Sequence, residues 1–183
     1  MTDVWHTRIL VAMTGLPATG KSAVADAIGR ALPAPVFSVD PLEATLNRAG
    51  ITREHRSGYA AYDLAAMLAE AQLRAGQSAV VDAVNGYGFV RTWWTEMAGR
   101  HHAPLVTIAT ICSDPGQHRR QLEDRTRAIE GFLYDVTWAD VEASMEEYEP
   151  PADADLVLDA VDPLDANIQR ALDCIANVIG GTE

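Results

Sequence analysis

The stretch that decides the fold of this chain is Gly15-Leu16-Pro17-Ala18-Thr19-Gly20-Lys21-Ser22, which has the pattern G-x-x-x-x-G-K-S. The apolar residues 9–13 precede it, and residues 23–28 continue in a pattern typical of a helix. In a strand, loop and helix of this order, the glycines let backbone N–H groups close around a polyphosphate at the helix N-terminus. The sequence therefore predicts a phosphate-binding loop between the first strand and the first helix.

The residues of this loop have distinct expected roles. We expect Lys21 to reach the β- and γ-phosphates of ATP or GTP and Ser22 to hold Mg²⁺. Lys21 is the only lysine among fourteen basic residues, and its compact ammonium suits a phosphate cradle in a chain that otherwise uses arginine. The alternative is a glycine-rich turn with an incidental lysine. The expected nucleotide-binding positions in the loop are Gly15, Pro17, Ala18, Thr19, Gly20, Lys21, Ser22 and Ala23.

Five short apolar runs with helical stretches between them predict an α/β fold, with a five-stranded parallel sheet and helices on both faces. The predicted strands are residues 9–13, 35–39, 79–81, 105–111 and 156–158. The predicted helices are residues 22–32, 42–49, 59–75, 89–98, 115–126, 138–148 and 163–179. Four of the strands run into an aspartate near the carboxyl end, which is where ligands bind in open α/β sheets.

Length and composition fit a single domain spanning residues 1–183, since 48% of the residues are hydrophobic. The formal net charge of −12 repels phosphate backbones, so we expect no nucleic-acid partner, whereas a small anionic ligand with Mg²⁺ is compatible. Cys112 and Cys174 are too few and too scattered for a disulfide framework. With neither a signal pattern nor an apolar run of membrane-spanning length, the chain is expected to be cytoplasmic.

Phosphoryl transfer requires a held donor, neutralised charge and an acceptor hydroxyl that can lose its proton. Asp82 follows the third predicted strand, where its carboxylate can reach the Mg²⁺ shell. Asp40 follows the second strand and is our candidate general base. An aspartate in front of Pro41 can also be a helix cap, and that alternative stays open. The remaining candidate substrate contacts are His55, Arg56, Tyr59, Tyr62, Asn85, Tyr87 and Arg91. Trp93 and Trp94 are expected to pack in the core or between helices.

Four arginines gather within nine residues of this acidic chain: Arg119, Arg120, Arg125 and Arg127. They lie between the fourth predicted strand and an irregular segment, so residues 119–137 are expected to form a short arginine-bearing lid. Arg120 and Arg127 are expected to neutralise the transferred phosphate, and Arg120 and Arg125 to contact the nucleotide. Pairing with Glu123 and Asp124 on a solvated surface is the alternative for some of them.

Beyond these motifs, the chain resembles the chloramphenicol phosphotransferase group of small P-loop kinases, which are related to gluconate kinases and zeta toxins. The resemblance lies in the phosphate loop, in residues 31–42 and 81–84, and in residues 111–114 leading into the arginines. It implies a three-layer sandwich like that of nucleoside-monophosphate kinases, with Asp40 as base, Asp82 near the metal and Arg120 and Arg127 in the lid. Residues 158–164 are similar to the loop beside the nucleotide base.

The resemblance implies an ATP- or GTP-dependent kinase acting on a hydroxyl group of a small molecule. An antibiotic, including a nucleoside antibiotic, is one such acceptor. The sequence departs from the group at Pro17 and Ala18 and in residues 85–88. The resemblance therefore predicts the fold and the type of reaction better than it predicts the substrate. Two alternatives are a zeta-toxin-like kinase of a nucleotide sugar and a nucleotide-dependent switch protein without an acceptor.

Overall fold

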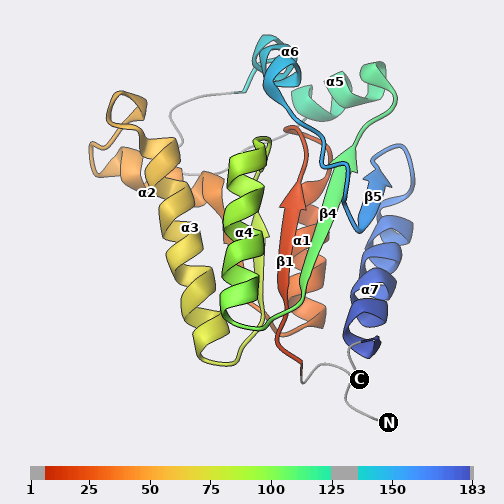
Figure 1. The fold of residues 1–183 in the computed structure, drawn as a ribbon. Helices are drawn as coiled ribbons and strands as arrows, with labels where there is room; N and C mark the ends of the chain where they lie inside the picture. The colour runs from red at the N-terminus through yellow and green to blue at the C-terminus, as the bar shows by residue number, and fades with distance from the viewer. Residues whose placement is uncertain (1–6, 125–135, 182–183) are drawn as a thin grey trace.

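A five-stranded parallel sheet forms the centre of the computed structural model, which describes residues 7–124 and 136–181 (Figure 1). The strands are β1 (Leu10–Thr14), β2 (Val36–Ser38), β3 (Ala79–Asp82), β4 (Leu105–Ile111) and β5 (Leu156–Asp159). Their order is β2-β3-β1-β4-β5, and each neighbouring pair runs parallel. The predicted sheet is confirmed, and β1, the strand that leads into the phosphate loop, lies at its centre.

Helices cover both faces of this sheet (Figure 1). The helices α1 (Lys21–Ala31) and α7 (Leu164–Gly180) pack on one face, and α3 (Ser57–Arg74) and α4 (Gly88–Arg100) on the other. Side chains alternate along β1, so that Val11 and Met13 lie in the core beneath α1 and α7. Leu10 and Ala12 lie in the core beneath α3 and α4. A strand buried on both faces must be apolar throughout, which explains the unbroken run at residues 9–13.

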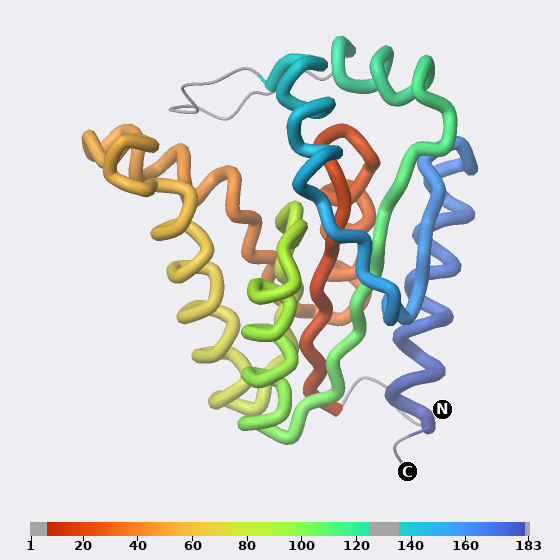
Figure 2. Tube along the Cα trace, turned by 45° about the horizontal axis from the view of Figure 1, so that its top comes forward, coloured from red at the N-terminus to blue at the C-terminus, as the bar shows by residue number. Residues whose placement is uncertain are grey.

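Shorter helices flank the carboxyl edge of the sheet: α2 (Val39–Arg48), η2 (Arg53–His55), α5 (Pro115–Glu123) and α6 (Trp138–Glu147). Figure 2 shows α5 and α6 together above the ends of β1 and β4, whereas α2 and the start of α3 lie on the other side. The phosphate loop leaves β1 at this same edge. The fold therefore surrounds the expected ligand site with helices that come from distant parts of the sequence.

The second strand and the helix after it differ from the prediction. β2 ends at Ser38 and α2 begins at Val39, so Asp40 lies in the first turn of a helix rather than at the end of a strand. Pro41 is accommodated there because the N–H groups of a first helical turn have no intrahelical acceptor. The prediction placed the helix start after this proline and was therefore three residues late. Within residues 7–124 and 136–181, no helix is both long and apolar enough to span a membrane.

Candidate functional site

The phosphate loop is shaped by backbone conformations that favour glycine. Gly15 has φ 142°, and a Cβ atom there would lie 2.3 Å from the backbone oxygen of Thr110 on β4. Gly20 has φ 82° and is the N-cap of α1. Ala18 also adopts a left-handed conformation, with φ 63°, although it is not a glycine. Both glycines of the G-x-x-x-x-G-K-S pattern are therefore favoured for steric reasons.

Lys21 lies folded against this loop, and the residue is 8% exposed. Its Nζ donates a hydrogen bond to the carbonyl oxygen of Leu16 at 2.9 Å. The same oxygen accepts a hydrogen bond from the hydroxyl of Thr19 at 2.8 Å, and that hydroxyl lies 2.7 Å from Thr110 Oγ1. The loop is therefore closed by its own side chains, with the ammonium group held over it.

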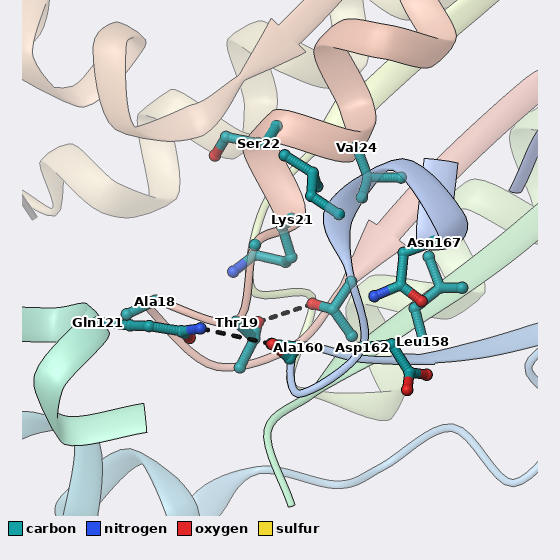
Figure 3. Close-up of a pocket in the computed structure, with 14 residues that line it drawn as sticks. Ala18, Thr19, Lys21, Ser22, Val24, Gln121, Leu158, Ala160, Asp162 and Asn167 are labelled. Carbon is teal, nitrogen blue, oxygen red and sulfur yellow. Dashed lines mark hydrogen bonds between the residues drawn. The ribbon is translucent and has the colours of Figure 1, made fainter. Parts of the chain in front are cut away.

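A cavity of about 450 Å³ opens beside the loop (Figure 3). The loop and the start of α1 line one side through residues 18–24, and residues 158–167, from β5 to the start of α7, supply the other side. Val24, Leu158 and Leu164 give it an apolar portion, whereas Lys21 and Ser22 give it a polar one. This combination of size and lining is typical of a small-ligand site. Of the predicted nucleotide-binding residues, those at positions 18–23 all line this cavity.

The two candidate carboxylates come from neighbouring elements at the same edge. Asp82 is 5% exposed, and its Oδ2 accepts a hydrogen bond from Ser38 Oγ at 3.0 Å. Parallel pairing explains this contact, because Ser38 on β2 is in register with Asp82, which is in register with Met13 on β1. Asp40 follows two residues after Ser38. Sequence reasoning did not single out Ser38, because its role depends on the register between two strands.

Tyr62 of α3 lies within electrostatic range of both carboxylates. The pKa of its phenol is raised to about 12, chiefly by burial and to a smaller extent by the charges of Asp40 and Asp82, against a lowering by the hydrogen bond from the backbone N–H of Asn85. Asp40, Asp82 and Tyr62 therefore share one region. Among the described residues, no group of three or more His, Cys, Asp or Glu side chains could hold a metal ion on its own. A Mg²⁺ ion held by few protein ligands and by phosphate oxygens does not need such a group.

Asn85, a predicted substrate contact, is instead buried and hydrogen-bonded inside the protein. The residue is 1% exposed, its Nδ2 donates to the carbonyl oxygen of Met13 at 2.6 Å, and its Oδ1 accepts from Trp94 Nε1 at 3.0 Å. We therefore correct the assignment, because both ends of the amide are used inside the protein. Trp94 is 1% exposed and packs in the core, as expected. The close approach that Gly86 allows is to the ring of Tyr148, 3.0 Å from a Cβ at that position.

Three other predicted substrate residues are exposed and are not among the residues that line the cavity: Arg56, Tyr59 and Tyr87. Tyr59 is exposed and contacts Trp93 edge to face, with ring centroids 5.7 Å apart. Tyr87 is exposed, stacks on Phe89 and donates its hydroxyl hydrogen to the carboxylate of Glu147. Arg56 is exposed and precedes α3 with φ 59°. Because Phe89 also packs against Trp93, rings from α3, α4 and the loop before α4 form one continuous row.

The predicted arginine lid is only partly described. Arg119 pairs with Glu123 on the exposed side of α5 at 3.1 Å, which is the surface alternative. Arg120 is exposed, is not among the residues that line the cavity, and reaches back toward Gly116. The structure therefore does not bring Arg120 to the phosphate loop. Arg125 and Arg127 lie outside the described residues.

Solved structures of similar fold include several kinases. APS kinase CysC of Mycobacterium tuberculosis, solved with AMPPNP and APS, is 21% identical, with a TM-score of 0.69 over 92% of this chain and 98% of that one. A gluconokinase from Sinorhizobium meliloti 1021 is 16% identical, with a TM-score of 0.71 over 97% and 96%. Kti12 of Chaetomium thermophilum, solved with ADP-AlF3, is 21% identical, with a TM-score of 0.64 over 93% and 98%. At these identities the likeness shows a shared fold.

Sequence comparison points to a family for most of the chain. No curated protein matches the sequence. A family model described as an AAA domain matches residues 10–151, a range that contains the phosphate loop, both candidate carboxylates and Tyr62. Since this match covers more than half of the chain, the protein belongs to the AAA domain family AAA_33.

Proposed function

We propose that this protein is a kinase that moves the γ-phosphate of ATP or GTP to a hydroxyl group of a small molecule. The observation that carries the proposal is the phosphate loop with Lys21 folded over it, at the polar end of a cavity of about 450 Å³. Support comes from the shared fold with an APS kinase and a gluconokinase. Asp40 and Asp82 at the same edge of the sheet supply the carboxylates that the reaction needs.

The residues of the cavity fit a nucleotide with Mg²⁺. Gly15 and Gly20 keep the loop backbone clear of side chains, and Lys21 brings a positive charge to it. The apolar portion near Leu158 and Leu164 suits the base, in agreement with the resemblance of residues 158–164 to a base-binding loop. We assign the Ser22 hydroxyl and the Asp82 carboxylate as protein ligands of Mg²⁺, which when bound would neutralise charge on the phosphates.

Asp40 is the proposed general base. The acceptor oxygen forms a bond to the γ-phosphorus while the bond to the bridging oxygen of the β-phosphate breaks, and the hydroxyl proton passes to the Asp40 carboxylate. Nucleoside diphosphate leaves with the bridging oxygen. The position of Asp40 in the first turn of α2, near Asp82 and Tyr62, is compatible with this role because the carboxylate is only half-buried. Contacts of Arg125 and Arg127 with the phosphates remain part of the proposal.

A screen for nucleoside diphosphate release in the presence of hydroxylated metabolites and antibiotics tests this function. An acceptor that raises release above the rate without acceptor supports it. With that acceptor, Asp40→Asn is expected to abolish turnover and to change nucleotide affinity by no more than a few-fold. Asp63→Asn, on the exposed side of α3, is the matched control and is expected to keep full turnover. Full turnover of Asp40→Asn would refute the assignment of the base.

A nucleotide-dependent switch is the second candidate, because the fold also resembles Kti12, which was solved with ADP-AlF3. A protein of this kind would hydrolyse nucleotide without any acceptor. Asp40→Asn would then leave hydrolysis unchanged, and no compound of the screen would raise diphosphate release. The same screen distinguishes an antibiotic acceptor from a nucleotide-sugar acceptor, because it shows which class of compound raises diphosphate release.

A further inference from the structure

His118 is a buried histidine that connects the phosphate loop with two helices. It lies on α5, is 2% exposed, and its Nε2 is 2.7 Å from the carbonyl oxygen of Pro17. A carbonyl oxygen only accepts hydrogen bonds, so Nε2 must carry the hydrogen. Trp138, the first residue of α6, meets the imidazole edge to face, with ring centroids 5.3 Å apart. His118 therefore holds a main-chain atom of the loop from outside the cavity.

The contact with Pro17 bears on the next peptide group of the loop. The Pro17–Ala18 peptide is trans, so its carbonyl oxygen and the N–H of Ala18 point in opposite directions. Ala18 lines the cavity, whereas Pro17 and His118 are not among the lining residues. Holding the oxygen toward α5 thus turns the Ala18 N–H away from α5. Ala18 has φ 63°, a backbone conformation that residues with a side chain rarely adopt, and the hydrogen bond to the preceding carbonyl oxygen helps to hold it.

The helix that carries His118 is itself fixed to the other wall of the cavity. The side chain of Asp114 caps α5 by accepting hydrogen bonds from the N–H groups of Gly116 and Gln117. The side-chain amide of Gln117 donates to the carbonyl oxygen of Ala160 at 2.8 Å, and that of Gln121 lies 3.5 Å from the same oxygen. Figure 3 shows the bond from Gln121 running beside the cavity to Ala160. α5 therefore joins the phosphate loop to the loop that follows β5.

We propose that His118 is a positioning residue for nucleotide binding: it holds the Pro17–Ala18 peptide so that the Ala18 N–H faces the phosphates, and Trp138 fixes its ring. The proposal rests on the proposed function for the identity of the ligand. It assigns a role to a residue that the sequence pattern does not mark, since His118 is separated from Pro17 by about a hundred positions.

A pair of amide substitutions separates this role from simple filling of space. The amide nitrogen of glutamine is as many bonds from the backbone as His118 Nε2, whereas that of asparagine is one bond short. We expect His118→Gln to bind AMPPNP with Mg²⁺ within about two-fold of the unmodified protein by calorimetry. We expect His118→Asn to bind about five-fold more weakly, the loss that one hydrogen bond predicts. Thermal midpoints of both variants show whether each one is folded.

Trp138 and the Ala18 amide give two further readouts. If Trp138 acts through His118, then Trp138→Leu weakens binding in the unmodified protein and adds little to His118→Asn. In the unmodified protein, the amide resonance of Ala18 is expected to shift strongly when AMPPNP with Mg²⁺ binds, so the proposal can be checked even if His118→Asn does not fold. Equal losses in the glutamine and asparagine variants, no loss in either, or an Ala18 resonance that does not move would overturn the proposal. Absence of binding by the folded unmodified protein would instead overturn the proposed function, and the proposal with it.

Discussion

Replacing Gly15 by alanine tests the steric basis of the phosphate loop. A Cβ atom at Gly15 would lie 2.3 Å from the backbone oxygen of Thr110 and 2.5 Å from its Oγ1. Backbone atoms of the central sheet cannot move aside cheaply, so the overlap is expected to cost about 1–3 kcal/mol. The backbone conformation, with φ 142°, adds about 1–3 kcal/mol for any residue with a side chain. We therefore expect the free energy of unfolding to fall by about 2–6 kcal/mol.

Gly50 is the matched control for this substitution. It has φ 85°, and a Cβ atom there would meet nothing within 4 Å. Gly50→Ala should therefore show only the conformational cost, about 1–2 kcal/mol. Urea denaturation of both variants, followed by circular dichroism, gives the two free energies. If Gly15→Ala is no more destabilising than Gly50→Ala, the close packing of the loop against β4 is not what requires a glycine.

Two further predictions concern the interior beside the loop. Because the pKa of Tyr62 is raised from 10.0 to about 12, the folded protein holds the phenol proton more tightly than the unfolded chain does. The resulting contribution to the free energy of unfolding is complete below pH 10, and about 2–3 kcal/mol of it is lost as the pH rises to 12. Tyr62→Phe should remove that part of the alkaline loss in denaturation curves, and an unchanged slope would contradict the burial argument. Asn85→Leu should lower the free energy of unfolding by about 2–5 kcal/mol, because it leaves the Trp94 N–H and the Met13 carbonyl oxygen unpaired. A variant of normal stability with a raised KM for the acceptor would show that Asn85 contacts substrate after all.

The sequence predicted what depends on local pattern. Residues 9–13 gave the central strand because a strand covered on both faces is apolar throughout. The glycines and Lys21 gave the phosphate loop, and the aspartates near the carboxyl ends of the strands indicated the edge of the sheet where the cavity lies. Each of these features follows from neighbouring residues alone, so it can be read without knowing the packing of distant segments.

The features that the sequence missed depend on contacts between distant segments. Ser38 meets Asp82 because two strands pair in one register, and His118 meets Pro17 because α5 lies over the loop. Asn85 was misassigned for the same reason, since its two partners belong to β1 and α4. An arginine-rich segment suggested phosphate contacts, but the helical rotation of α5 presents His118 to the loop and leaves Arg120 exposed.

Calorimetric titration of the folded protein with ATP or GTP in the presence of Mg²⁺ tests the central claim most directly. We predict uptake of one nucleotide per chain, with affinity reduced by more than ten-fold in Lys21→Met, because the ammonium that lies over the phosphate loop is lost. No uptake by the folded protein, or equal uptake by Lys21→Met, would contradict the claim that this loop binds the triphosphate.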